Sequence, residues 1–158
     1  MAALSADTHV PVVGSNVTKY AFKAVGADTF FRGALVFGDA TNGKAQVTTP
    51  AAGDVFLGVC VKQTVAAAAD DLVECYITGT FAFAMATPAE GDVGDVMVVD
   101  VTGTASDNQA DAVTGADATL AANDILIGKI SAISNEDTTR AIVTINPGWI
   151  YSATLGWV

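Results

Sequence analysis

The chain has 158 residues, which is enough for one hydrophobic core and too few for two cores that each fold independently. Its 17 acidic and 7 basic residues give a net charge of -10, which argues against nucleic-acid binding because the charge repels phosphate. Apolar residues make up 51% of the chain and charged residues 15%, against roughly 25% charged residues in soluble domains, so an assembly is expected to cover part of the surface.

The first 16 residues are interpreted as an N-terminal arm. They lack the basic start and the unbroken apolar stretch of a secretory signal, so synthesis in the cytoplasm is expected. A short apolar run in the arm ends at a glycine-containing turn and consists of Val10, Pro11, Val12 and Val13. No apolar run approaches the roughly 20 residues of a membrane helix, so no membrane segment is expected.

Residues 17–24 predict the first strand, because Lys19 and Lys23 alternate with Tyr20 and Phe22 and only the aromatic side would be buried. Further short strands, each bounded by turn residues, are predicted at 33–37, 44–48, 55–64, 72–78, 80–85 and 95–101. Two of them have alternating residues that are expected to share a buried face, namely Val55, Leu57, Val59 and Val61 in one and Val73, Cys75 and Ile77 in the other.

The second half of the chain continues this pattern. Phe81, Phe83 and Met85 alternate with alanines, which favours a central strand with one bulky and one flat face. Residues 87–90 predict one helical turn, and residues 102–124 predict an extended surface loop or short edge strand. Strands at 125–133 and 140–145 are expected to form a closing hairpin.

The spacing of strands and turns, without any long helical periodicity, predicts an all-β protein. We expect a single-domain small β-barrel or sandwich over residues 17–147, with an N-terminal arm at 1–16 and an aromatic C-terminal extension at 148–158. Residues 54–58 are similar in sequence to residues 124–128, which would put two strands at equivalent positions in related halves of a barrel. Five positions are too few to establish a duplication. The glycines that end both stretches, Gly58 and Gly128, predict a bulge or a close crossing of strands.

The residues offer little for catalysis. The single histidine, His9, lies in the predicted arm, where its imidazole would not be held in place, so a nucleophile would lack its base. Cys60 and Cys75 lack the close spacing of a zinc or redox motif and are interpreted as buried free thiols, although a disulfide between neighbouring strands would be open to them in an oxidising environment. We assign no catalytic, cofactor-binding or metal-binding residue. Calcium stays as a minor alternative at two aspartate pairs, Asp92 with Asp95 and Asp107 with Asp111, neither of which has a full ligand loop.

The C-terminal extension is rich in large apolar side chains that rarely stay in water. Trp149 and Ile150 either close the bottom of the barrel or take part in an oligomer interface. The full set of interface candidates is Trp149, Ile150, Tyr151, Leu155 and Trp157.

Between Tyr20 and Pro147 the chain resembles the capsid decoration (cement) proteins of tailed bacteriophages. The resemblance is carried by the order of short blocks: Phe31-Arg32-Gly33-Ala34-Leu35-Val36, Phe56-Leu57-Gly58-Val59, Gly79-Thr80-Phe81-Ala82, Gly91-Asp92-Val93-Gly94, Leu126-Ile127-Gly128-Lys129-Ile130 and Ala141-Ile142-Val143-Thr144-Ile145. None of these blocks is a catalytic signature.

The resemblance implies a non-enzymatic structural protein on the outer surface of the expanded virion capsid, where it bridges subunits of the major capsid protein. It also implies a homo-oligomer, with a trimer favoured, and no cofactor. The arm, through residues 10–13, is a candidate to add a strand to an exposed capsid sheet edge. The alternative is a head-fibre or receptor-binding adhesin that recognises host carbohydrate, and an enzyme comes third.

Overall fold

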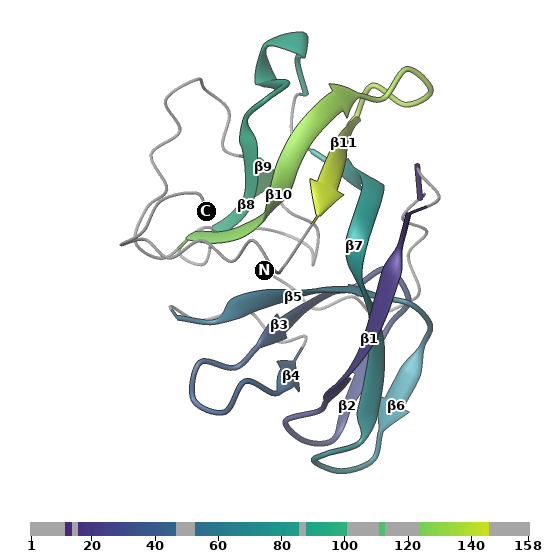
Figure 1. Ribbon diagram of the computed structural model, residues 1–158, viewed down its shortest axis with the longest axis vertical. Helices are drawn as coiled ribbons and strands as arrows, with labels where there is room; N and C mark the ends of the chain where they lie inside the picture. The colour runs from purple at the N-terminus through teal and green to yellow at the C-terminus, as the bar shows by residue number, and fades with distance from the viewer. Residues whose placement is uncertain are drawn as a thin grey trace.

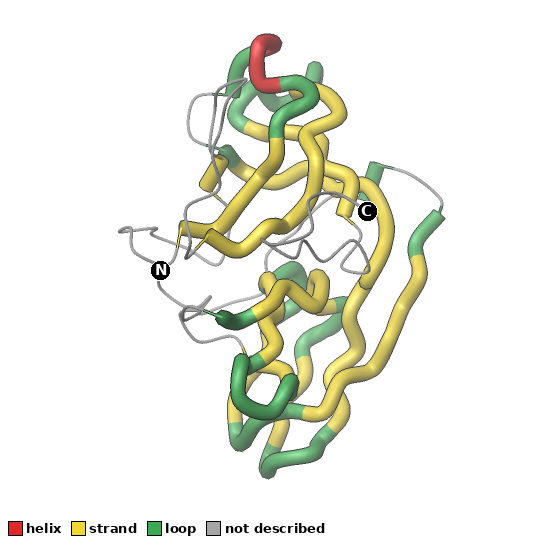
Figure 2. Tube along the Cα trace, turned by 60° about the vertical axis from the view of Figure 1, so that its left-hand side comes forward, coloured by secondary structure: helices red, strands yellow, loops and turns green. Residues whose placement is uncertain are grey.

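The computed structural model describes residues 12–13, 16–46, 53–85, 88–100, 111–112 and 124–145. They form the strands β1 (Thr18–Lys23), β2 (Asp28–Phe30), β3 (Leu35–Gly38), β4 (Ala45–Gln46), β5 (Val55–Cys60), β6 (Thr64–Ala66), β7 (Leu72–Ala84), β8 (Val96–Asp100), β9 (Asp111–Ala112), β10 (Asp124–Ile133) and β11 (Arg140–Ile145), with one short 3-10 turn, η1 (Glu90–Asp92). The prediction of an all-β fold is confirmed for these residues. In Figure 2 the helical segment is confined to one end of the molecule.

Nine strands of the described chain form one antiparallel sheet in the order β4-β3-β5-β7-β11-β10-β8-β9, with β1 paired to the other edge of β7; β2 and β6 form a small separate sheet. β7 is 13 residues long and joins the two halves, as Figure 1 shows. It pairs with β1 and β5 up to Thr78, and with β11 from Gly79 onward. The two strands predicted at 72–78 and 80–85 are therefore one strand that changes partners at Gly79.

The described side chains form two apolar cores. The first fills the half of the sheet formed by β7, β8, β10 and β11 and consists of Leu35, Phe37, Phe56, Val59, Phe81, Phe83, Met85, Met97, Ile125, Ile127, Ile130, Ile133, Ala141, Val143 and Ile145. The second lies under β1, β2 and β6 and consists of Ala24, Phe30, Ala34, Val36, Ala45, Leu57, Cys60, Ala66, Val73 and Cys75. β3 and β5 contribute to both cores, which explains their unbroken apolar sequences.

Two predictions about buried faces are wrong. Leu57 and Val59 do not share a face, because a register shift opposite Val36 and Phe37 sends Val59 to the first core and Leu57 to the second. Tyr20 does not share the burial of Phe22: Phe22 packs against the second core, whereas Tyr20 is 58% exposed.

The two halves of the sheet repeat one unit. Read from the centre outward, β7, β5, β3 and β4 match β11, β10, β8 and β9, and the chain visits both sets in the same order. The two similar stretches, 54–58 and 124–128, lie at the starts of β5 and β10, and these strands occupy equivalent positions in the two units. Each strand carries a register shift at the residue just before its glycine, at Leu57 before Gly58 and at Ile127 before Gly128.

Main-chain hydrogen bonds follow the same correspondence. Gly33 and Gly94 each lie two residues before the third strand of their unit, with φ of 83° and 101° respectively. The N–H of Gly33 donates to the carbonyl of Cys60, and that of Gly94 donates to the carbonyl of Ile130, both at 2.9 Å. The return bonds run from Cys60 N–H to the Ala34 carbonyl at 2.9 Å and from Ile130 N–H to the Asp95 carbonyl at 2.8 Å.

The units differ in how their two central strands are connected. β10 and β11 are joined by a short turn, whereas the link from β5 to β7 contains β6, which pairs with β2. β1, β2 and β6 thereby add a cover to the first unit that the described part of the second unit lacks. Ala24, just after β1, forms a parallel bridge to Ala45 of β4, which brings β1 back to the sheet edge.

Candidate binding surface

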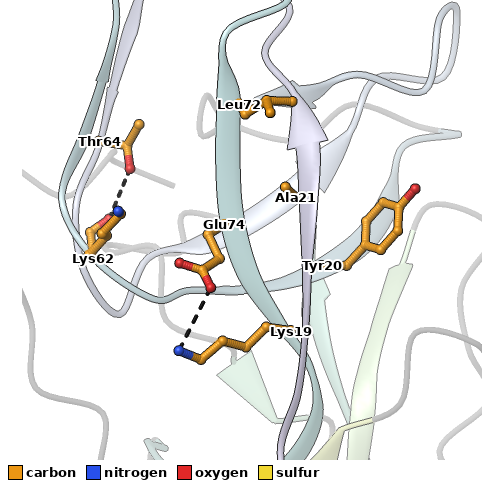
Figure 3. Close-up of a pocket in the computed structure, with 7 residues that line it drawn as sticks. All are labelled: Lys19, Tyr20, Ala21, Lys62, Thr64, Leu72 and Glu74. Carbon is orange, nitrogen blue, oxygen red and sulfur yellow. Dashed lines mark hydrogen bonds and ion pairs between the residues drawn. The ribbon is translucent and has the colours of Figure 1, made fainter.

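A shallow groove of about 380 Å³ lies on the cover of the first unit. It is lined by Lys19, Tyr20, Ala21, Lys62, Thr64, Leu72 and Glu74 (Figure 3). The strand β1 contributes Lys19, Tyr20 and Ala21, and the start of β7 contributes Leu72 and Glu74. Lys62 comes from the link between β5 and β6, and Thr64 is the first residue of β6. The groove therefore lies where β7 meets β1 and the link to β6, two segments that the described part of the second unit does not repeat.

Strand alternation places four of the groove residues, Lys19, Ala21, Leu72 and Glu74, on one face of the β1–β7 pair. Ala21 of β1 lies opposite Glu74 of β7, and Lys23 lies opposite Leu72. This face of the strand pair therefore carries side chains from both strands. The Lys19 ammonium lies 3.7 Å from a Glu74 carboxylate oxygen and 5.3 Å from the ring centroid of Tyr76. This ion pair and cation–π contact fix one wall of the groove.

The groove has an apolar and a cationic component. The apolar component is Leu72, which is 62% exposed. The Lys62 ammonium makes no ion pair within the described residues, while Thr64 donates to the Lys62 carbonyl at 3.3 Å. A partner surface that offers an apolar side chain beside a carboxylate fits this combination. The groove could not be predicted from the sequence, because a lysine or leucine that faces solvent on a strand is common.

Three lysines around the cover are already paired with acids. Lys44 lies 2.9 Å and Lys23 3.9 Å from the same carboxylate oxygen of Asp70. The hydrogen bond from Lys44, followed by the charge of Lys23, lowers the pKa of Asp70 below its usual range. Lys62 therefore differs from Lys19, Lys23 and Lys44 in having its charge available to a partner.

Two of the four predicted contact residues of the arm, Val12 and Val13, lie within the described part of the chain. Val12 forms a bridge with Phe81, and the N–H of Val13 donates to the Thr80 carbonyl at 2.8 Å, so both extend the β1 edge of β7. Their side chains are 44% and 49% exposed. Val10 and Pro11 lie outside the described residues, and so do all five interface candidates in the C-terminal extension and His9; their roles stay predictions.

The buried acids serve the fold. Asp54 accepts hydrogen bonds from the Ala40 N–H at 2.9 Å and the Gln46 side-chain amide at 2.7 Å. Asp92 accepts the Ala89 N–H at 2.8 Å and so caps η1. This turn begins at Glu90, three residues later than the helical turn predicted at 87–90. No three His, Cys, Asp or Glu side chains gather into a metal-binding group in the described ranges. Asp107 lies outside them, and Asp111 is in β9.

Comparison with known proteins finds no matching family model, no matching curated protein and no matching solved structure. Among the residues that the structure describes, none belongs to a helix with the length and hydropathy needed to cross a bilayer.

Proposed function

We propose that this chain is a phage capsid decoration protein, which binds the outer surface of an expanded capsid and bridges neighbouring major capsid protein subunits. The ordered resemblance to cement proteins carries the proposal. Each of its six blocks falls on a strand or tight turn of the repeated units: β3, β5, β7, the turn after η1, β10 and β11. Such blocks build the sheet, and contacts with a partner would come from the loops, edges and cover around it.

Mass action explains how such a protein would act. A protein that binds the expanded lattice and not its precursor stabilises the expanded form, by a free energy that grows with the logarithm of the free protein concentration relative to Kd. Many copies, each contributing a modest binding energy, add up over one shell, and an oligomer such as the proposed trimer would increase the avidity.

The test is cosedimentation of the purified chain with empty shells of the phage whose capsid gene adjoins this gene. We expect saturable binding to expanded shells, little binding to unexpanded ones, and a higher disruption temperature for the decorated shell. Failure to bind either shell would refute the proposal. Binding of the isolated oligomer to host cells would instead support the adhesin alternative.

We assign the groove on the cover to the capsid contact. Replacing Lys62 with Glu reverses the charge that has no ion-pair partner in the described chain and should weaken binding to expanded shells about tenfold or more. Lys129→Glu makes the same change at an exposed lysine on β10 and should leave binding unchanged. Equal effects of both substitutions would indicate a general charge effect and not a contact at the groove.

A further inference from the structure

Cys60 and Cys75 face each other across two neighbouring strands. They are register partners in the antiparallel ladder between β5 and β7, and both side chains belong to the second core. Neither cysteine is in a disulfide, and Cys60 is 1% and Cys75 0% exposed, as the interpretation of buried thiols predicted. Their pairing could not be read from the sequence, because 14 residues, including those of β6, lie between them.

The hydrogen bonds around the pair identify its type. The N–H of Val61 donates to the Glu74 carbonyl at 3.0 Å, which makes the neighbouring pair a hydrogen-bonded one. Cys60 itself directs its N–H and carbonyl toward Ala34 and Gly33 on the other side of β5. Because the two pair types alternate, Cys60 and Cys75 form a non-hydrogen-bonded pair, in which the Cα atoms lie about 4.5 Å apart and the side chains are closest.

This separation falls within the Cα range of disulfides, about 4.4–6.8 Å. Gly58, two residues before Cys60, allows the close approach of the strands: a Cβ on Gly58 would lie 3.3 Å from the Cβ of Cys75. The Cys60 thiol now donates to the Lys62 carbonyl at 3.0 Å, so a rotation about its Cα–Cβ bond is the change needed to direct the sulfur toward Cys75.

We propose that Cys60 and Cys75 are a modification site, at which a small-molecule disulfide oxidises the two thiols to one intrachain, cross-strand disulfide. One cysteine thiolate attacks the small disulfide, forms a mixed disulfide and releases one small thiol. The second cysteine thiolate then attacks the protein sulfur of the mixed disulfide and releases the other small thiol. Two protein thiols are thereby oxidised, one external disulfide is reduced, and two protons leave the cysteines.

Burial sets the rate of this reaction. Removal from water, with smaller contributions from the nearby Cys60 and Glu74, raises the pKa of the Cys75 thiol far above its usual range, so little thiolate exists in the closed structure. Oxidation therefore requires the cover of β1, β2 and β6 to open. The thiols would stay reduced in a cytoplasm and form the bond slowly in an oxidising medium outside the cell. The inference does not rest on the proposed function.

The experiment uses the full chain and oxidised glutathione. The protein is incubated in its native state, and separately refolded from denaturant, with the oxidant; free thiols are then alkylated under denaturing conditions and the mass is measured. We expect a mass loss of about 2 Da, protection of both cysteines, faster reaction during refolding, and a thermal midpoint higher by roughly 5–10 °C that a reducing agent reverses.

A persistent glutathione adduct, a disulfide-linked dimer, or two alkylated cysteines after refolding in oxidant would overturn the proposal. Cys60→Ser and Cys75→Ser should each abolish the mass loss and the gain in midpoint. If either variant fails to fold, proteolysis of the oxidised wild-type chain decides the matter, because a linked peptide pair that contains both cysteines must be present.

Discussion

At the scale of single residues, two glycines set the distance between strands. A Cβ on Gly58 would lie 2.2 Å from the Tyr76 carbonyl oxygen, and one on Gly128 would lie 2.3 Å from that of Thr144. Contacts this short do not occur for real Cβ atoms, so each strand pair would have to separate to accept a side chain. The sequence alone indicated a close crossing at both positions, and the structure confirms it.

Replacing these glycines with alanine should destabilise the protein unequally. Gly58→Ala combines the clash with a φ of 150°, which L-residues rarely adopt, and should lower the free energy of unfolding by about 2–4 kcal/mol. Gly128→Ala meets the clash alone and should cost about 1–3 kcal/mol. Gly26→Ala is the control, since a Cβ there meets nothing within 4 Å. Urea denaturation measures all three, and an unaffected Gly58→Ala variant would contradict the close approach.

The buried carboxylate of Asp54 makes a second residue-scale prediction. Asp54→Ala leaves the Ala40 N–H and the Gln46 amide without this acceptor and should lower the free energy of unfolding by about 1–3 kcal/mol. Glu136→Ala, at an exposed position, should change it by less than about 0.5 kcal/mol. Urea denaturation compares them, and similar values would show that Asp54 contributes nothing beyond its charge.

At the scale of elements, the turn between β10 and β11 is organised by one aspartate. Asp137 accepts the N–H of Thr139 at 3.0 Å and the Arg140 guanidinium at 3.1 Å, while Arg140 also donates to the Ala82 carbonyl on β7 at 3.0 Å. This network ties the hairpin to the central strand. Hydrogen bonds from Thr139, side chain first and then backbone, with a smaller contribution from Arg140, lower the pKa of Asp137.

A carboxyl group whose pKa is lower in the folded than in the unfolded state stabilises the fold at a pH above its unfolded-state pKa, which is about 3.9. This stabilisation is lost as the pH falls through the folded-state pKa. Wild type should therefore be more stable than Asp137→Asn at pH 7, and the difference should shrink toward zero below about pH 3. The effect should be small, because Asp137 is exposed. Urea titrations at both pH values measure it, with Glu136→Gln as the control. A difference that stays constant with pH would point to the shape of the turn and not to its charge.

The sequence predicted the elements well where a local pattern determines them. Strands at 17–24, 33–37, 95–101, 125–133 and 140–145 are present with small boundary changes. The predicted strand at 55–64 is instead β5 and β6, and β2 was not predicted. These differences depend on which strand lies alongside, and a pattern within one segment does not contain that information.

The groove residues were not predicted for the same reason. Lys19, Lys62 and Leu72 become neighbours through the pairing of β1 with β7 and the path of the link from β5 to β6. The sequence instead drew attention to apolar runs in the arm and the C-terminal extension, most of which lie outside the described residues.

At the scale of the whole molecule, the position of Val12 and Val13 refines the prediction for the arm. Deleting residues 2–11 should weaken binding to expanded shells and leave the free energy of unfolding unchanged, because it keeps the Val13 hydrogen bond to β7. Deleting residues 2–13 should additionally cost about 1 kcal/mol of stability. Sedimentation with shells and urea denaturation separate the two effects. Full binding after both deletions would exclude the arm from the capsid contact.

The central strands of the two units, β7 and β11, pair antiparallel. The same arrangement arises when one strand pairs with its own copy across the two-fold axis of a homodimer. A shorter polypeptide with a single unit would need to meet another molecule to complete this sheet, and its folding would depend on protein concentration. Here both units share one covalent backbone, which holds each at a high effective concentration for the other at any dilution. Within the described residues the two units differ most at the cover with its groove, which only the first unit carries.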